Sequence, residues 1–305
     1  MTQESYIRVR DRKTEAGSSR DLSYPPVPEP LRIGTYDNHT HLEIADGENP
    51  MDYREHLELA AEAGIIGAVQ VGGSLETSRW SAQVAAIEPR LLAAVALHPN
   101  VAAEFESVAA LDDAIAGIAE LATQPRVRAV GETGLDYFRT GAELLHLQQH
   151  SFEAHIEIAK QNNIALQIHD RDAHDDVVAT LLRVGAPERT VFHCFSGGRE
   201  LAEICIERGW YASFSGTVTF KKNEGLREAL MMLPPELILV ETDAPFLTPE
   251  PFRGRPNSPY LIGLTVARMA EVRGISDDEM AAQLTLNTEA VYGSWADGLS
   301  AEQAS

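Results

Sequence analysis

From residue 33 onwards, short apolar runs rich in β-branched residues alternate with longer stretches of helical periodicity. We predict strands at about 33–38, 66–71, 92–97, 127–132, 164–169, 190–194, 210–214 and 237–242. We predict helices near 51–63, 76–88, 107–122, 143–162, 174–184, 199–208, 222–232, 258–273 and 276–291. Eight strand–helix units in about 260 residues indicate an α/β fold of the TIM (β/α)8 barrel type, in which helices connect parallel strands. A doubly wound open sheet is compatible with the same alternation.

The segments on either side of this pattern have a different composition. Residues 1–32 mix charges of both signs and finish in YPPVPEP, which predicts a disordered or loosely docked N-terminal arm. The barrel domain is expected over 33–293, followed by a C-terminal tail at 294–305. Because the arm carries no candidate ligand and no apolar periodicity, we expect its deletion to leave hydrolysis per active site near wild type.

The charge of the chain limits its partners. With 46 Asp+Glu against 25 Lys+Arg, the net charge of −21 repels nucleic acid at long range. This excludes a high-affinity DNA-coating protein, but it leaves room for an enzyme that binds a short strand in one cleft. No apolar run approaches the roughly 20 residues of a membrane span, and residues 1–21 contain no apolar targeting core. We therefore predict a soluble, cytoplasmic protein.

Candidate metal ligands follow the ends of several predicted strands. His39 and His41 lie two apart in DNHTHLE, so both point to the same side of an extended segment. Glu132 follows an apolar run in VGETGLDYF, where a carboxylate is costly unless it is paired or bound to metal. Taken singly, each could also be a solvent-facing or loop-facing residue.

Four more such residues come from later strands. His169 and His193 end the fifth and sixth strands, and Glu241 and Asp243 follow the eighth, with Asp243 nearer the mouth. A hydrogen-bonded core histidine is the alternative for each histidine alone, but coincidence at five strand ends is improbable. The sequence therefore predicts a metal site.

The number and kind of ligands indicate which ions would bind. Nitrogen and oxygen ligands without thiolate suit Zn, Mn or Fe, and Mg where carboxylate and substrate oxygens dominate. Six protein ligands are too many for one catalytic ion that keeps open positions. Two divalent ions that share Glu132 account better for the set.

Basic residues on the loops after the strands are candidate phosphate contacts. They are Arg139, Arg171, Lys221, Lys222, Arg253 and Arg255. We expect Arg253 and Arg255 to be the best suited to bidentate binding, with Arg139 and Lys221 assisting. Solvated loop charge is the alternative for each of them. Of the remaining histidines, we expect His98 near the barrel mouth as a supporting or loop residue and His155 in the core.

Several segments together resemble one family. DNHTHLE, AVGETGLDYFR, HDRDAHDD, VFHCFSGG and VETDAPFLTPEPFRGRPNSPYLI are similar, in the same order, to segments of the TatD-related deoxyribonucleases of the metal-dependent amidohydrolase superfamily. The resemblance covers about residues 34–293 and implies a TIM barrel with a di-metal centre. It also implies metal-dependent phosphodiester hydrolysis, with 3′–5′ exonucleolytic cleavage of DNA. Single-stranded DNA or DNA ends, bound weakly, would be the partner.

Residue roles follow from the same resemblance. His39, His41 and Asp243 would hold one ion, His169 and His193 the second, and Glu132 would bridge them. Asp243 would act as general base towards a water that the two ions activate as hydroxide. Asp170, directly after His169, departs from the family pattern because it adds an acidic group. This departure bears on the strength of substrate binding more than on metal binding.

Two other functions are compatible with these residues. A di-metal centre can equally hydrolyse an ester, an amide or a lactone, including the aminoacyl ester of a tRNA. A non-catalytic binding protein with an inherited barrel is disfavoured by the intact ligand set. Loop charge separates the hydrolases, because a phosphodiesterase needs the basic cluster whereas a lactonase favours apolar loops.

Overall fold

The computed structural model of this chain describes residues 7–13 and 17–298. Eight parallel strands form one sheet in the order β10-β9-β8-β7-β6-β5-β4-β2. The strands are Thr35–Thr40 (β2), Ile65–Gly72 (β4), Leu91–Val95 (β5), Val127–Asp136 (β6), Ala165–Arg171 (β7), Thr190–Phe192 (β8), Tyr211–Phe214 (β9) and Ile238–Val240 (β10). Each lies within a few residues of its predicted position.

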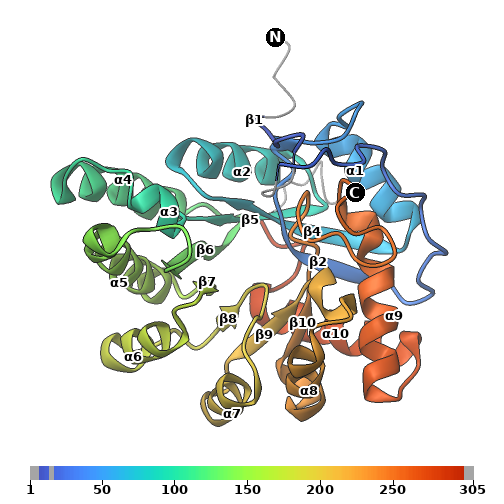
Figure 1. The fold of residues 1–305 in the computed structure, drawn as a ribbon. Helices are drawn as coiled ribbons and strands as arrows, with labels where there is room; N and C mark the ends of the chain where they lie inside the picture. The colour runs from blue at the N-terminus through green and yellow to red at the C-terminus, as the bar shows by residue number, and fades with distance from the viewer. Residues whose placement is uncertain (1–6, 14–16, 299–305) are drawn as a thin grey trace.

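Helices connect the strands and lie outside them (Figure 1). The α-helices are Tyr53–Glu62 (α1), Leu75–Ile87 (α2), Pro99–Ala102 (α3), Val108–Leu121 (α4), Leu145–Asn162 (α5), His174–Val184 (α6), Arg199–Arg208 (α7), Glu224–Met232 (α8), Ile262–Arg273 (α9) and Asp277–Tyr292 (α10). Short 3₁₀ helices are Ala142–Leu144 (η1), Gly216–Thr219 (η2), Pro235–Leu237 (η3) and Pro259–Leu261 (η4). Only α3 lacks a predicted counterpart, and α10 begins at the capping box that Ser276 and Glu279 form.

The first and last strands of the sheet meet. Thr40 forms a parallel bridge to Ala244, and the backbone N–H of Asp243 donates to the carbonyl of His39 at 2.9 Å. Next to these contacts, Thr242 donates to the buried carboxylate of Asp37 in β2 through both its backbone N–H and its hydroxyl. The sheet is therefore a nearly closed TIM barrel, which confirms the predicted fold and excludes the open sheet.

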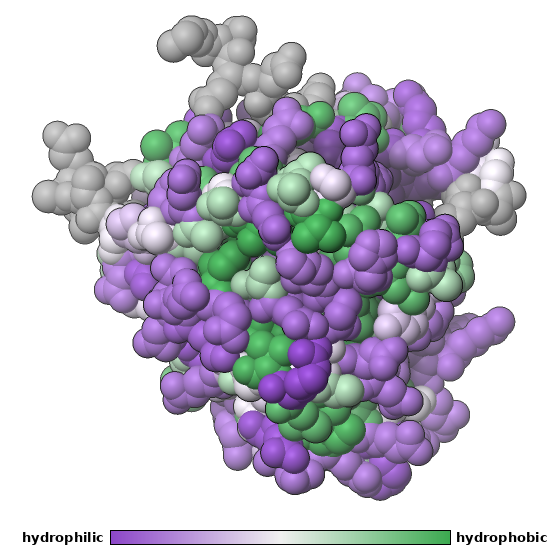
Figure 2. Space-filling model, turned by 90° about the vertical axis from the view of Figure 1, so that its left-hand side faces the viewer, coloured by the Kyte–Doolittle hydropathy of each residue, from purple (hydrophilic) through white to green (hydrophobic). Residues whose placement is uncertain are grey.

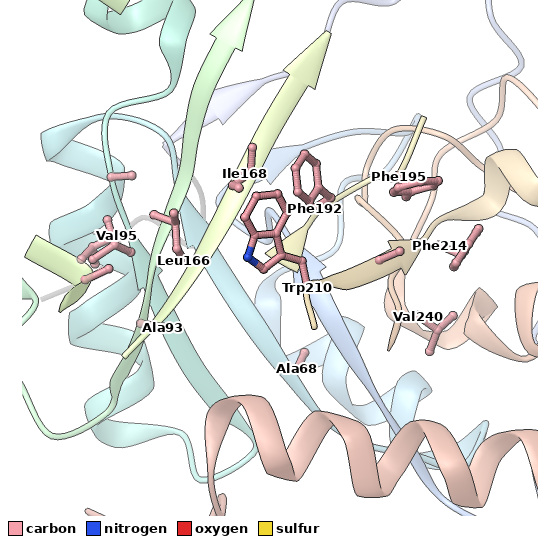
Figure 3. Close-up of a cluster of buried hydrophobic side chains, with 14 of the residues drawn as sticks. Ala68, Ala93, Val95, Leu166, Ile168, Phe192, Phe195, Trp210, Phe214 and Val240 are labelled. Carbon is pink, nitrogen blue, oxygen red and sulfur yellow. The ribbon is translucent and has the colours of Figure 1, made fainter. Parts of the chain in front are cut away.

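Alternation along the strands divides the core into two layers. One set of side chains points outward and packs under the helices (Figure 3). It includes Ala68, Ala93, Val95, Leu166, Ile168, Phe192, Phe214 and Val240. The residues between them fill the barrel interior, including Val69, Leu92, Ala165, Val191 and Leu239. Hydrophilic side chains cover most of the face in Figure 2, as expected for the outer surfaces of the helices.

The end of the chain closes the base of the barrel. Trp295 is 8% exposed, stacks on Tyr36 with ring centroids 4.1 Å apart, and packs with Val291 and Tyr292. The indole N–H of Trp295 also donates to the carbonyl of Arg90. The barrel domain thus extends beyond the predicted boundary at 293, because an aromatic plug seals the lumen. Residues 299–305 of the predicted tail lie outside the described part.

The described part of the N-terminal arm, 7–13 and 17–32, contacts the barrel, whereas residues 1–6 and 14–16 of the predicted arm lie outside the described part. Arg8–Val9 (β1) pairs in parallel with Ile44–Ala45 (β3), which follows β2 directly. Further along the arm, the Tyr260 hydroxyl donates to the carbonyl of Pro25 at 2.6 Å. In Figure 1 the dark blue arm passes over α1. These backbone and side-chain contacts hold the described part of the arm against the barrel, and apolar periodicity is not needed for them.

Within residues 7–13 and 17–298, no helix is both long enough and apolar enough to cross a membrane.

Candidate metal centre

A bulge in β2 aims two histidines into the barrel mouth. Three residue steps on β2, from Asp37 to Thr40, face only two steps on β4. Such an extra residue switches which side chains face inward. Tyr36 faces the interior below the bulge, and His39 and His41 face it above. Their Nε2 atoms lie 3.2 Å apart, so the predicted pair does converge.

Glu132 reaches the same point from β6. A second register shift between Val130 and Thr133 reverses the alternation there, and Glu132 turns inward. The flanking glycines allow β6 and β7 to approach closely. A Cβ on Gly131 would lie 2.4 Å from the Cβ of Gln167, and one on Gly134, at φ +145°, 2.1 Å from the carbonyl of His169. The position of the carboxylate therefore depends on these two glycines.

The two oxygens of Glu132 face different partners. Oε1 lies 3.3 Å from Nε2 of His41 and 3.8 Å from Nε2 of His39. Oε2 lies 2.9 Å from Nε2 of His193 and 3.1 Å from Nδ1 of His169. One buried carboxylate thus stands between two pairs of histidines.

Asp243 follows β10 and completes the first of these groups. Its Oδ1 lies 3.6 Å from Nε2 of His41 and 3.8 Å from Nε2 of His39. The side chain is 14% exposed, more than that of Glu132, so it borders the open mouth of the site. All six predicted ligands are thus brought together, in clusters of His, Glu and Asp that are able to hold metal.

Outer hydrogen bonds fix which ring nitrogen of His41, His193 and His169 faces the cluster. Nδ1 of His41 lies 2.9 Å from the carbonyl of Val71, which only accepts, so Nδ1 carries the proton. Nδ1 of His193 is 3.2 Å from the carboxylate of Glu241. Nε2 of His169 is 3.2 Å from Asp136. These contacts leave the inward nitrogen of each ring as a lone pair, the form that binds a metal ion.

Two supporting residues, Asp136 and Glu241, were not assigned these roles from the sequence, and a third, His98, was expected near the mouth as a supporting or loop residue. Asp136 and Glu241 orient His169 and His193, and Glu241 is fully buried. Nδ1 of His98 accepts from the backbone N–H of Asn100, so a neutral ring carries its proton on Nε2, 3.8 Å from Glu132. His98 therefore offers a hydrogen-bond donor to the site. The sequence signal for Asp136 was its position four residues after Glu132. In the structure, β6 continues past its predicted end and includes Asp136.

The pKa values of the clustered side chains indicate a site that favours binding of cations. Burial acts to raise the pKa of Glu132, but the charge of His193 and hydrogen bonds from His169 and His193 hold it well below its ordinary value. Burial acts to lower the pKa of His41, but hydrogen bonds to Asp243 and Glu132 raise it well above its ordinary value. Burial lowers the pKa of His98 to about 3, so this ring stays neutral. The carboxylates are thus ionised and gain from a neighbouring cation, which fits divalent metal ions.

The predicted phosphate contacts have different environments. Arg255 donates through Nε to the carbonyl of Ser23 and through Nη2 to that of Tyr24, and it pairs with Asp21 at 3.5 Å. Its guanidinium therefore holds the arm, a role that was not predicted from the sequence. Arg253 is exposed and lies over the ring of Phe220, 4.2 Å from the centroid.

The other basic residues lie on loops at the same end of the barrel. Arg139 and Lys221 are exposed, after β6 and η2 respectively. Arg171, at the end of β7, lies over the ring of Phe138 at 3.8 Å. Phe138 and Phe220 therefore pack against arginines.

A TIM barrel whose mouth gathers histidine lone pairs around buried carboxylates defines a metal-dependent hydrolase. The sequence model of the family described as "TatD related DNase" matches residues 36–293, and the chain belongs to this family.

Relatives and solved structures agree with this assignment. A protein of Mycobacterium tuberculosis described as "Uncharacterized metal-dependent hydrolase TatD" is 41% identical over 261 residues, covering 84% of this chain and 97% of that protein. A Citrobacter rodentium protein described as "3'-5' ssDNA/RNA exonuclease TatD" is 32% identical over 79% of this chain and 92% of its own length. The crystal structure of the Escherichia coli TatD homologue YjjV matches with a TM-score of 0.75 and 28% identity, covering 85% of this chain and 98% of that one.

Proposed function

We propose that this protein is a divalent-metal-dependent phosphodiester hydrolase that removes nucleotides from the 3′ ends of single-stranded DNA. The observation that carries the proposal is the placement of Glu132, whose two oxygens face two separate groups of ligands. His39, His41 and Asp243 would hold one ion with Oε1. His169 and His193 would hold a second with Oε2. Mg, Mn or Zn fits this nitrogen and oxygen donor set.

Bound divalent ions would supply a water of lowered pKa and stabilise negative charge on phosphoryl oxygens. The chain's own groups do the rest. Asp243, at the open side of the cluster, can accept the proton of the attacking water as general base. The Nε2–H of His98 can donate a hydrogen bond to Glu132 or to a substrate oxygen. Glu241 and Asp136 keep His193 and His169 in the orientation that presents their lone pairs.

The substrate assignment is supported by loop charge and by a relative. Arg139, Lys221 and Arg253 lie on loops at the ligand end of the barrel, where phosphates would approach. The Citrobacter rodentium relative carries the description of a ssDNA/RNA exonuclease. With a net charge of −21, weak binding of a short strand is expected, and the metal ions would carry much of the attraction. A cytoplasmic location agrees with such a substrate.

The test is a time course on end-labelled single-stranded DNA with Mg²⁺ or Mn²⁺, with and without EDTA. A 5′ label should give a ladder that shortens with time, and a 3′ label should be released at once as mononucleotide. EDTA and the Glu132→Ala variant should each abolish both. Hydrolysis of a p-nitrophenyl ester or a lactone by the wild-type protein, with no release of nucleotide, would instead favour the ester or amide hydrolase.

A further inference from the structure

The N-terminal arm, which lies outside the residues that match the family, reaches the rim of the metal centre. β1 pairs with β3, only three residues after His41. From the end of β1, the guanidinium of Arg10 donates through Nη1 to the carbonyl of Pro245. It also lies over the ring of Phe246, 4.7 Å from the centroid. Arg10 therefore contacts the loop that begins at Asp243.

A buried ion-pair network fixes Arg10 in this place. Nη1 of Arg10 donates to Asp46 at 3.1 Å. Asp46 also accepts both Nη atoms of Arg20, at 2.9 and 2.6 Å. The side chains of Arg20 and Asp46 are only 3% and 2% exposed. Two guanidinium groups share one carboxylate, so the arm adds net positive charge beside the acidic end of β10.

The loop that Arg10 contacts has a costly backbone conformation. Asp243 has φ 55° and Leu247 φ 54°, in the left-handed region that residues other than glycine seldom adopt. Such conformations are strained and persist only where the surroundings fix them. On one side the loop is fixed by the backbone bonds of Asp243 to His39 and of Ala244 to His41. On the other side it contacts Arg10 and Asn257, whose Nδ2 donates to the carbonyl of Phe246.

Phe246 links the arm to His41, a candidate ligand that directly follows β2. Its ring lies edge-on to that of His41, with centroids 6.4 Å apart, while its other contact is the guanidinium of Arg10. Removing Arg10 would therefore take away one of two donors to the Pro245 carbonyl, the other being the backbone N–H of Asn257 at 3.3 Å, and would leave the ring of Phe246 without its cation. Pro245 and Phe246 both lie within three residues of Asp243.

We propose that the arm is an integral part of the catalytic domain, and that Arg10 is a positioning residue that fixes the loop 243–247 and so holds Asp243 as a ligand. The inference rests on the proposed function in that Asp243 binds metal. It replaces the expectation from the sequence that deleting the arm leaves hydrolysis unchanged. That expectation considered only ligands and apolar periodicity, whereas Arg10 acts through a carbonyl and an aromatic ring.

The experiment compares the full-length wild type with Arg10→Ala, Arg10→Lys and, as a matched control, Arg12→Ala, which removes an exposed arginine of the same arm. Mn²⁺ binding is measured by calorimetry, unfolding by circular dichroism, and kcat and KM on single-stranded DNA. We expect Arg10→Ala to weaken Mn²⁺ binding and lower kcat by about tenfold each, as for other groups that orient metal ligands. KM should change by less than about twofold. Arg10→Lys, which keeps the charge and a donor but not the flat stack, should recover part of both.

Other outcomes overturn the proposal. Unchanged Mn²⁺ affinity in Arg10→Ala, whatever its melting temperature, would mean that the arm only stabilises the fold. A rise in KM alone would make Arg10 a direct substrate contact. Should Arg10→Ala not fold, Arg10→Lys is decisive, because wild-type Mn²⁺ affinity in that variant contradicts the role of the flat guanidinium. Metal affinity needs no substrate, so a wild-type protein that binds Mn²⁺ but does not cleave DNA refutes the proposed function and leaves this inference testable.

Discussion

The carboxylate of Glu241 lies directly behind the ring of His193. Its Oε1 is 3.2 Å from Nδ1 of His193 and 2.7 Å from the backbone N–H of Cys194, and the side chain is fully buried. A carboxylate in this place fixes the tautomer of the ring and makes the opposite nitrogen a better ligand. Glu241 therefore acts on the site through His193.

The first prediction follows from this pair. Glu241→Gln keeps the size of the side chain but removes its charge, so the ring of His193 loses its ionic partner. We expect metal affinity or turnover to fall by about 10- to 100-fold, with near-wild-type circular dichroism. Metal titration and initial rates check this, and Glu228→Gln, which changes an exposed glutamate, is the control. Wild-type metal affinity and rate in Glu241→Gln would show that the contact is only structural.

The second prediction concerns Glu132. Glu132→Ala removes both oxygens that face the two ligand groups, so two bound ions cannot share a ligand. We expect loss of one equivalent of metal and a fall in turnover of at least about a thousandfold, since a bridging ligand supports both ions. Elemental analysis of dialysed protein gives the metal content, and circular dichroism confirms folding. A variant that still holds two ions and turns over normally would remove Glu132 from the mechanism.

The third prediction separates two neighbouring arginines. If metals and a few basic side chains hold two to four phosphates, the salt slope of binding to single-stranded DNA should be about −1.5 to −3. Arg253→Ala should flatten this slope by about 0.7 and raise KM, because Arg253 is exposed at the ligand end of the barrel. Arg255→Ala should leave the slope unchanged and lower the melting temperature, because Arg255 holds the carbonyls of Ser23 and Tyr24. Binding is measured with a non-hydrolysable strand from about 50 to 200 mM salt. An altered slope in Arg255→Ala only would reverse these assignments.

The fourth prediction concerns acid stability. Burial lowers the pKa of His56 to about 4, from an ordinary value of 6.5. As pH falls below 6.5 the unfolded chain takes up the proton first, so the stability that the neutral ring contributes is complete above pH 6.5 and is lost towards pH 4. The shift corresponds to about 3 kcal/mol. Urea unfolding at pH 7.5, 6 and 5 should show this loss, and His56→Asn should reduce the pH dependence. His155 has the same shift for the same reason, so His155→Gln is a second, independent check. An identical pH dependence in both variants and wild type would contradict the assignment.

Much of the site could be anticipated because its residues follow strand ends. In a parallel barrel all strands end at one rim, so His169, His193 and Asp243 had to meet there once eight strands were predicted. The spacing of His39 and His41 placed both on one side. The contacts of Arg255 with the arm could not be predicted, because no pattern in the loop sequence shows which carbonyls a guanidinium will reach.

The sequence by itself determined the alternation of strands and helices and the set of candidate ligands, because period-2 and period-3.6 patterns and strand-end positions are local properties of the chain. Contacts between β2 and the end of β10 decided that the sheet closes into a barrel. Only the tertiary structure decided how these groups are aimed. The bulges in β2 and β6, the lone pair that Glu241 leaves on His193, and the contact of Arg10 with the loop after Asp243 each depend on partners far away in the sequence. Such contacts are set by closure of the barrel and by burial, which bring distant residues together and which no local pattern records.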